Sequence, residues 1–202
     1  MFFGFRKRRS LQQMLDTVAA CGLSLREGVS AEALYQPRTQ WEPERSVATI
    51  EKGGFESLLI AMGDDGYDRA THVSLDPPSD DVWHFDFEFI EDHGAYKTIV
   101  KRLCRMTKGI LSLNEIEDYV DVEEGVAWVE MKRAGRTERI ELTVNNDWTD
   151  PKIFLEMQER LKTTGSSRRF AMQSLGQDCL IVCQTPENLK ALHRATGLRF
   201  ML

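Results

Sequence analysis

Residues 126–144 place the strongest constraint on how this 202-residue chain can fold. Residues 126–131 read VAWVEM, and residues 139–144 read RIELTV, so apolar side chains alternate with others in both stretches. Ala134-Gly135 lies between them and has the composition of a turn. Two alternating stretches joined in this way predict a hairpin or meander of antiparallel strands.

A second alternating stretch, VWHFDFEFI, occupies residues 82–90. Its aromatic side chains fall on one face of a strand, where we expect them to anchor a core. The other face would carry His84, Asp86 and Glu88, which we expect to point outward. Asp92 then has the position of a helix N-cap, because apolar residues recur at helical spacing from Tyr96 to Met106.

From residue 82 onward the predicted order of elements is β-α-β-β-β-α-β-β-α-β. This order predicts an α+β fold with a mostly antiparallel sheet and segregated helices. A smaller helix-rich segment over residues 1–75 precedes it, with helices predicted after Ser10 and over residues 55–62 and a loop over residues 36–44. The stretch 63–81 is rich in Gly, Asp and Pro, so we expect a linker or long loop there. We place a soft boundary between domains of residues 1–75 and 76–202, although a single domain fits too.

Composition predicts a cytoplasmic protein without membrane segments. No run of 18 apolar residues is present. The basic cluster Arg6–Arg9 is followed by polar residues rather than the apolar core of a signal peptide. Four cysteines (Cys21, Cys104, Cys179 and Cys183) are typical of reduced thiols rather than of a disulfide framework. The sequence does not indicate an oligomeric state.

The net charge of −6 is distributed unevenly. Residues 64–92 contain ten acidic residues and one basic residue, and residues 115–130 contain seven acidic residues and no basic one. If these segments reach one surface, that surface attracts a basic protein partner and repels nucleic acid. The predicted partner-binding residues are Asp64, Asp65, Asp80, Asp81, His84, Asp86, Glu88, Glu115, Glu117, Glu123 and Glu124.

Catalytic motifs are scarce. Asp121, Glu130 and Lys132 have the arrangement that the PD-(D/E)xK nuclease superfamily uses, an Asp on one strand followed by Glu-x-Lys on the next, where the carboxylates hold a divalent metal. A metal-dependent nuclease or hydrolase is therefore the alternative hypothesis. No Walker loop, Gly-x-Gly-x-x-Gly or Gly-x-Ser-x-Gly motif occurs. We therefore predict no cofactor, no metal site and, as the first hypothesis, no enzyme activity.

Four runs carry a resemblance: WHFDFEFIEDHGAY, NNDWTDP, GQDCLIVCQTPE and the closing GLRF. Their order resembles that of small bacterial immunity proteins from contact-dependent and secretion-delivered toxin systems, over residues 83–202. The resemblance implies a cytosolic protein that binds one toxin domain and blocks its active site. It assigns no functional residue, because immunity proteins share no single motif. A regulatory or scaffold domain with another protein partner is the remaining alternative.

Overall fold

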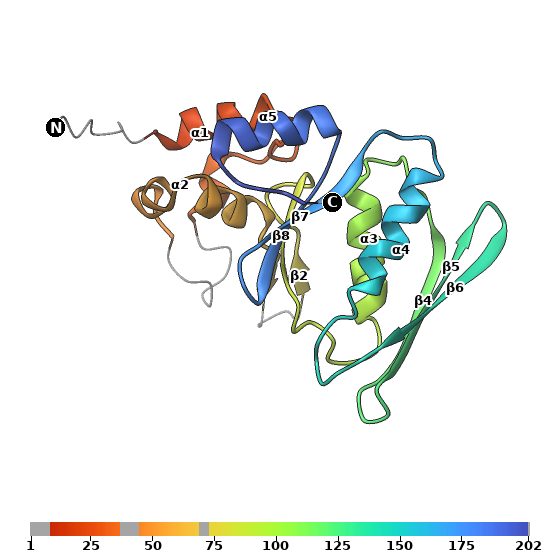
Figure 1. Ribbon diagram of the computed structural model, residues 1–202. Coiled ribbons are helices and arrows are strands. Elements are labelled where there is room, and N and C mark those ends of the chain that lie inside the picture. The colour runs from red at the N-terminus through yellow and green to blue at the C-terminus, as the bar shows by residue number, and fades with distance from the viewer. Residues whose placement is uncertain (1–8, 37–44, 69–72, 202) are drawn as a thin grey trace. The chain divides into compact units, whose positions relative to one another are not determined.

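The computed structural model describes residues 9–36, 45–68 and 73–201 (Figure 1). The predicted loop over residues 36–44 and the basic cluster Arg6–Arg9 lie almost entirely outside these ranges. The chain forms two compact units: unit 1 contains residues 1–84 and 187–200, and unit 2 contains residues 85–186 and 201–202. The boundary that we predict near residue 76 remains a prediction. The first segment of unit 1 ends at His84, within a strand, and the last helix belongs almost entirely to unit 1.

Unit 1 is mainly helical. Its elements are α1 (Leu11–Ala19), the 3-10 helix η1 (Ala31–Leu34), α2 (Val47–Gly63), β1 (Gly66–Asp68), β2 (Val73–Leu75), the first half of β3 (Val82–Asp86), and α5 (Pro186–Thr196), whose first residue belongs to unit 2. Ser10 caps α1 as predicted, and its side chain forms a capping box with Gln13. The linker predicted over residues 63–81 instead contains an antiparallel hairpin of β1 and β2.

The end of α2 shows why a glycine stands there. A Cβ atom on Gly63 would lie 2.7 Å from the backbone nitrogen of His84 and 2.9 Å from the carbonyl carbon of Trp83. Only glycine lets the helix approach the β3 backbone this closely. The helix is also longer than the predicted one, and its axis breaks at Gly54, where φ is +69°.

Unit 2 has the predicted α+β architecture, with helices separate from its small antiparallel sheets. One sheet has the order β3-β8-β7, with β7 at Arg169–Ser174 and β8 at Asp178–Gln184. The other has the order β4-β5-β6, with β4 at Asn114–Asp121, β5 at Val126–Arg133 and β6 at Arg136–Thr143. The helices are α3 (Ala95–Met106) and α4 (Lys152–Lys162).

The β4-β5-β6 sheet has one buried and one open face. β5 lies in the middle and pairs antiparallel with both β4 and β6; Tyr119 stands opposite Trp128, and Val129 stands opposite Ile140. α3 and α4 lie side by side against one face (Figure 1). That face is buried and carries Ile116, Val120, Ala127, Val129, Met131, Ile140 and Leu142. Burial of these side chains provides most of the driving force that holds the sheet to the helices.

The turn between β5 and β6 confirms the predicted hairpin. Ala134 and Gly135 have φ values of +47° and +76°. Positive φ at both central residues is the signature of the type I′ turn, whose twist matches that of the flanking strands. Glycine adopts this conformation freely, whereas alanine does so at a cost.

The start of α3 differs from the prediction. Gly94, not Asp92, occupies the N-cap position. The carboxylate that satisfies the helix start belongs to Asp118 on β4, which accepts hydrogen bonds from the Gly94 and Lys97 backbone N–H groups at 2.8 and 3.1 Å. A carboxylate at this end is favoured by the helix dipole. The prediction of Asp92 was wrong because the partner comes from a distant strand.

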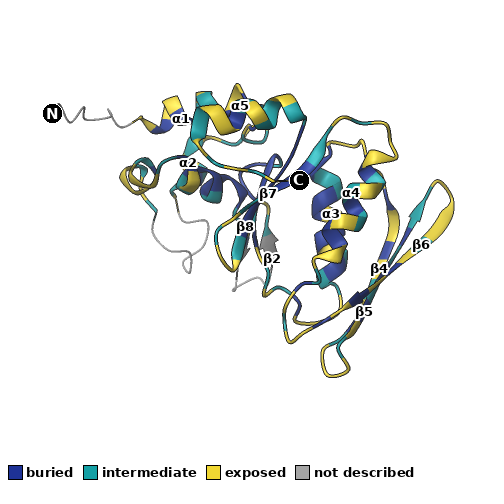
Figure 2. Cartoon of the chain, viewed as in Figure 1, coloured by how far each residue is buried: buried dark blue, intermediate teal, exposed yellow. Residues whose placement is uncertain are grey.

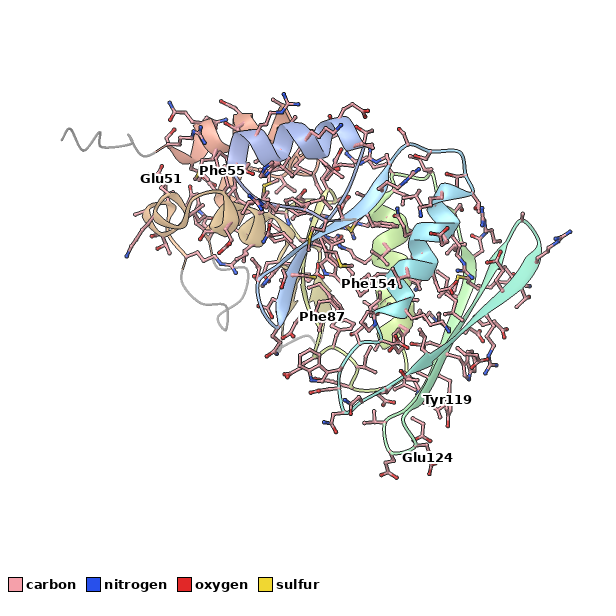
Figure 3. The ribbon with its side chains drawn as sticks, in the orientation of Figure 1. Glu51, Phe55, Phe87, Tyr119, Glu124 and Phe154 are labelled. Atoms are coloured by element: carbon pink, nitrogen blue, oxygen red, sulfur yellow. The ribbon has the colours of Figure 1, made fainter. Side chains whose placement is uncertain are left out.

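The aromatic residues that follow Trp83 form part of the core of unit 2. The ring centroid of Phe85 lies 5.3 Å from that of Phe87 and 5.4 Å from that of Phe154 on α4, in edge-to-face geometry. Figure 3 labels Phe87 and Phe154. The strand predicted over residues 82–90 is shorter than expected, because β3 ends at Asp86, but Phe85 and Phe87 do pack in the core as predicted. All four cysteines are free. Among the described residues, no helix has the length and apolar character needed to cross a membrane.

Candidate binding surface

Within unit 1, the predicted acidic residues mostly serve the fold. Asp81 is 2% exposed and accepts hydrogen bonds from the backbone and hydroxyl of Ser24, so it cannot contact a partner. Asp65 accepts a hydrogen bond of 2.9 Å from Trp83 Nε1. Asp80 is partly exposed. The prediction of a partner surface is therefore wrong for Asp81.

His84 also departs from the predicted outward row. Its side chain is 19% exposed, and its Nδ1 lies 3.3 Å from Asp64 Oδ1. Asp64 is also paired with Arg45. Burial alone would raise the pKa of Asp64, but the hydrogen bonds and charges of His84 and Arg45 together lower it below its ordinary value. Asp64 and His84 thus form an internal ion-pair group.

The other two residues of that row lie in unit 2 and are exposed as predicted. Asp86 and Glu88 are both open to solvent. Asp86 Oδ1 accepts hydrogen bonds from the Glu88 backbone at 2.9 Å and from Gln177 Nε2 at 3.2 Å, so it shapes the turn that ends β3. Glu88 is the freer carboxylate of the two.

The end of the sheet where β4 turns into β5 holds the densest exposed charge. Glu123 and Glu124 are exposed in this turn, and Glu117 is exposed farther back along β4, opposite Glu130. No basic side chain within the described part of the chain forms an ion pair with these three glutamates. Figure 2 shows exposed residues along β4 and β6 and at this turn, and Figure 3 labels Tyr119 and Glu124 here. Glu115 differs, because its carboxylate lies 2.5 Å from Lys132 Nζ.

The proposed nuclease residues do not converge. Asp121 pairs with Val126, whereas Glu130 pairs with Glu117, four residues away along β4. This separates the two carboxylates by about 13 Å along the strand. Asp121 instead accepts a hydrogen bond from the Glu124 backbone, and Lys132 is occupied by Glu115. No group of three or more potential metal ligands occurs in the residues that the structure describes.

The open face of the sheet carries an aromatic row that the sequence analysis missed. Tyr119 and Trp128 stack with ring centroids 6.0 Å apart and an interplanar angle of 13°. His93 lies 5.0 Å from Tyr119 on one side, and the guanidinium carbon of Arg139 lies 4.1 Å from the Trp128 ring on the other. The residues come from the loop before α3 and from β4, β5 and β6, so the row crosses the whole sheet.

Exposed apolar side chains gather at the acidic end of the same sheet. Tyr119 is 37% exposed, Val126 on the same face is 46% exposed, and Val122 in the turn is exposed as well. We call Tyr119, Val122, Val126 and Trp128 the hairpin patch. Isolated exposed apolar residues need no explanation, but neighbouring ones on one open sheet face indicate a contact surface.

The loop before α3 brings further acidic residues next to the edge strand β4. His93 Nδ1 accepts a hydrogen bond of 3.2 Å from the Val120 backbone, and Asp118 holds Gly94. These contacts fix exposed Glu91 and Asp92 beside β4. The acidic stretch that ends at residue 92 and the one that begins at residue 115 therefore do meet within unit 2.

The titration of Tyr119 reports the negative field at the hairpin patch. Its pKa is raised by the charge of Asp121, by the 3.3 Å hydrogen bond to that carboxylate, and to a smaller extent by burial and by the charge of Glu124. A negative potential that opposes loss of the phenolic proton equally favours a positive group placed there.

A signal for this surface was present in the sequence. Once residues 126–144 are known to form a hairpin, Trp128 and Glu130 share a face opposite to Val129, and Tyr119 falls on the same face from the preceding strand.

Comparison with known protein families, with curated proteins and with solved structures gave no match.

Proposed function

We propose that this protein is an acidic binding protein that binds a basic protein domain through the open face of the β4-β5-β6 sheet. The observation that carries the proposal is the set of exposed carboxylates on β4 and in the β4–β5 turn, Glu117, Glu123 and Glu124, which form no ion pair with a basic side chain among the described residues. Lys132, Arg133 and Arg136 lie toward the other end of the sheet, next to the β5–β6 turn. Arg139 lies in the middle of the sheet, in the same cross-strand row as Glu117. The face is therefore electrically polarised.

Such a surface gives a clear kinetic advantage. Charges of one sign attract an oppositely charged partner over a Debye length of about 8 Å at physiological salt. Steering of this kind raises association rates by about ten- to a thousandfold. The same charges repel the phosphate backbone of nucleic acids. A basic protein is thus the partner class that the charge supports.

The finer form of the proposal is an immunity protein that acts in the cytosol and neutralises a cognate bacterial toxin by covering its active site. Two features support it: the resemblance of residues 83–202 to immunity-type proteins, and the acidic face, since toxins that act on nucleic acids carry basic active sites. The nuclease alternative receives no comparable support, because Asp121 and Glu130 lie far apart on the hairpin.

The test uses the product of the gene adjacent to the one for this protein. Expressed alone, it should arrest growth, and co-expression of this protein should restore growth through a complex that survives purification. Binding should weaken as salt rises from about 0.05 to 0.3 M. An adjacent product that is harmless and forms no complex would rule out the immunity form.

Matched charge variants test the surface itself. The triple variant Glu117→Gln, Glu123→Gln and Glu124→Gln should slow association by about tenfold at low salt. The control triple variant replaces three exposed glutamates of unit 1, Glu27, Glu32 and Glu56, and changes the net charge equally. Equal slowing in both variants would mean that net charge, and not this face, attracts the partner.

A further inference from the structure

The hairpin patch and the carboxylates around it divide two roles between them. Glu123 and Glu124 are exposed and flank the turn, whereas Tyr119 and Trp128 stand on the sheet face with part of each ring open. An apolar, aromatic centre within a charged rim is the anatomy of a protein–protein interface. Tyr, Trp and Arg are also the residues that most often carry the binding energy.

The aromatic row is already ordered before a partner binds. Tyr119 and Trp128 are stacked, and Arg139 is held between the Trp128 ring and Glu141, to which its Nε donates a hydrogen bond of 2.7 Å. Side chains fixed in this way lose little conformational freedom on association, so contacts made with them are retained as net affinity.

The sheet face already binds one positively charged side chain of the protein itself. Arg139 stacks on an aromatic ring beside a carboxylate, an internal example of cation–π and charge recognition together. At the acidic end the same ingredients occur, Tyr119 with Asp121 and Glu124, and neither carboxylate is ion-paired with a described lysine or arginine. Basic side chains of a partner fit this rim, and apolar ones fit Val126 and Trp128.

We infer that the hairpin patch is the energetic centre of the interface and that its occupant is a basic protein surface with an apolar knob ringed by lysine or arginine. This inference rests on the proposed function and adds to it separate roles for the charged and the apolar residues. The carboxylate rim sets the association rate, while Tyr119, Val126 and Trp128 set the dissociation rate. Neither an acidic nor a uniformly polar partner satisfies both parts of the surface.

The test compares two peptides of equal charge on the full chain. One is the acetylated amphipathic peptide amide KLAKLAKKLAKLAK, and the other is acetylated hexalysine amide. At about 20 mM salt, where screening is weak, both should bind, and the amphipathic peptide should bind more tightly and dissociate more slowly. Binding is followed by backbone amide shifts in NMR, which also locate the contact.

The decisive variant is the double substitution Tyr119→Thr with Val126→Thr. Threonine keeps the strand preference of both positions and removes the apolar surface. It should reduce the affinity for the amphipathic peptide by at least about fivefold and reduce that for hexalysine by less than about twofold, because the carboxylates remain. Val126→Thr alone, which is nearly isosteric, gives a smaller loss in the same direction if the double variant folds poorly. The control is Leu155→Gln on α4, a residue that is 67% exposed outside the patch and should have no effect.

Each remaining outcome separates the inference from the function. Equal binding of both peptides, or no change in the double threonine variant, overturns the patch as energetic centre and leaves the acidic binding function standing. If neither peptide binds, the proposed function itself fails. Tighter binding of oligothymidine than of hexalysine, or self-association of the chain that Tyr119→Thr abolishes, overturns the inference in favour of nucleic acid or of a second copy.

Discussion

Asp118→Ala should destabilise unit 2 strongly for a change at a partly exposed residue. Asp118 accepts two hydrogen bonds, from the backbone N–H groups of Gly94 at 2.8 Å and of Lys97 at 3.1 Å. Each capping bond contributes about 1 kcal/mol, and a negative charge at a helix N-terminus adds about 0.5 kcal/mol. The expected loss of unfolding free energy is therefore about 2–3 kcal/mol.

Urea unfolding followed by circular dichroism measures this loss. With an m-value of about 2 kcal/mol per molar urea, the midpoint should fall by about 1 M. Hydrogen exchange at the Lys97 amide should accelerate as well, because its acceptor is gone. Asp118→Asn retains one acceptor oxygen but no charge, so about half of the loss is expected.

Glu117→Ala provides the matched control for this prediction. Glu117 precedes Asp118, carries the same charge, and points to the open face of the sheet. Its removal should change stability by less than about 0.5 kcal/mol. If Asp118→Ala costs no more than this control, Asp118 does not cap α3 in solution and the argument for the anchored loop is refuted.

Three further predictions concern other parts of the fold. Ala134→Asn should raise the free energy of unfolding by about 0.5–1 kcal/mol and the melting temperature by a few degrees, because asparagine tolerates the φ of +47° better than alanine. Gly135→Ala should lower both quantities. Melting curves check both variants, and an unchanged melting temperature for the asparagine variant contradicts the turn assignment. Arg160→Met should cost about 1–2 kcal/mol in urea unfolding, because Arg160 is only 12% exposed and pairs with Glu138 at 2.9 Å, and a change below about 0.5 kcal/mol would show that this pair is not stabilising. Because the pKa of Asp64 is lowered in the folded protein, its stabilising effect is present above its ordinary pKa of 3.8 and is lost as the pH falls below that value. Between pH 6 and pH 3 the wild type should therefore lose more unfolding free energy than Asp64→Asn. Equal losses would contradict the ion-pair group.

The fold of unit 2 follows closely from local patterns. Period-two stretches became β5 and β6, and the turn between them lies at the expected residues. Amphipathic spacing placed α3 and α4 correctly, because a helix with one apolar stripe must bury it against a sheet. These features depend on residues close together in the chain, where sequence patterns are most informative.

Features that depend on distant residues were not predicted. The cap of α3 comes from Asp118, more than twenty residues beyond the helix start, and nothing local to α3 indicates it. The hairpin of β1 and β2 lies in a stretch whose Gly, Asp and Pro content is typical of a loop. Short strands of three residues carry too little pattern to overcome that composition.

The candidate site was predicted by charge alone, and charge does not distinguish structural from available carboxylates. In unit 2 several aspartates are used by the fold: Asp86, Asp118, Asp121 and Asp150 each accept a hydrogen bond from a backbone N–H. Among the described glutamates of unit 2, none does so. For Asp86, Asp121 and Asp150 the difference is physical, because the short aspartate side chain keeps its oxygens next to the local backbone. Asp118 is the exception, since it accepts from the distant start of α3.

The extra methylene of glutamate has the opposite effect, since it carries the carboxylate away from the backbone and into solvent. In an acidic strand or turn, the identity of each acid thus separates two roles that net charge combines. Glu117, Glu123 and Glu124 are the residues whose neutralisation should alter binding without altering stability. Asp118 and Asp121 are those whose removal should alter stability first, and any effect of theirs on binding should arise through the turn and the loop that they hold.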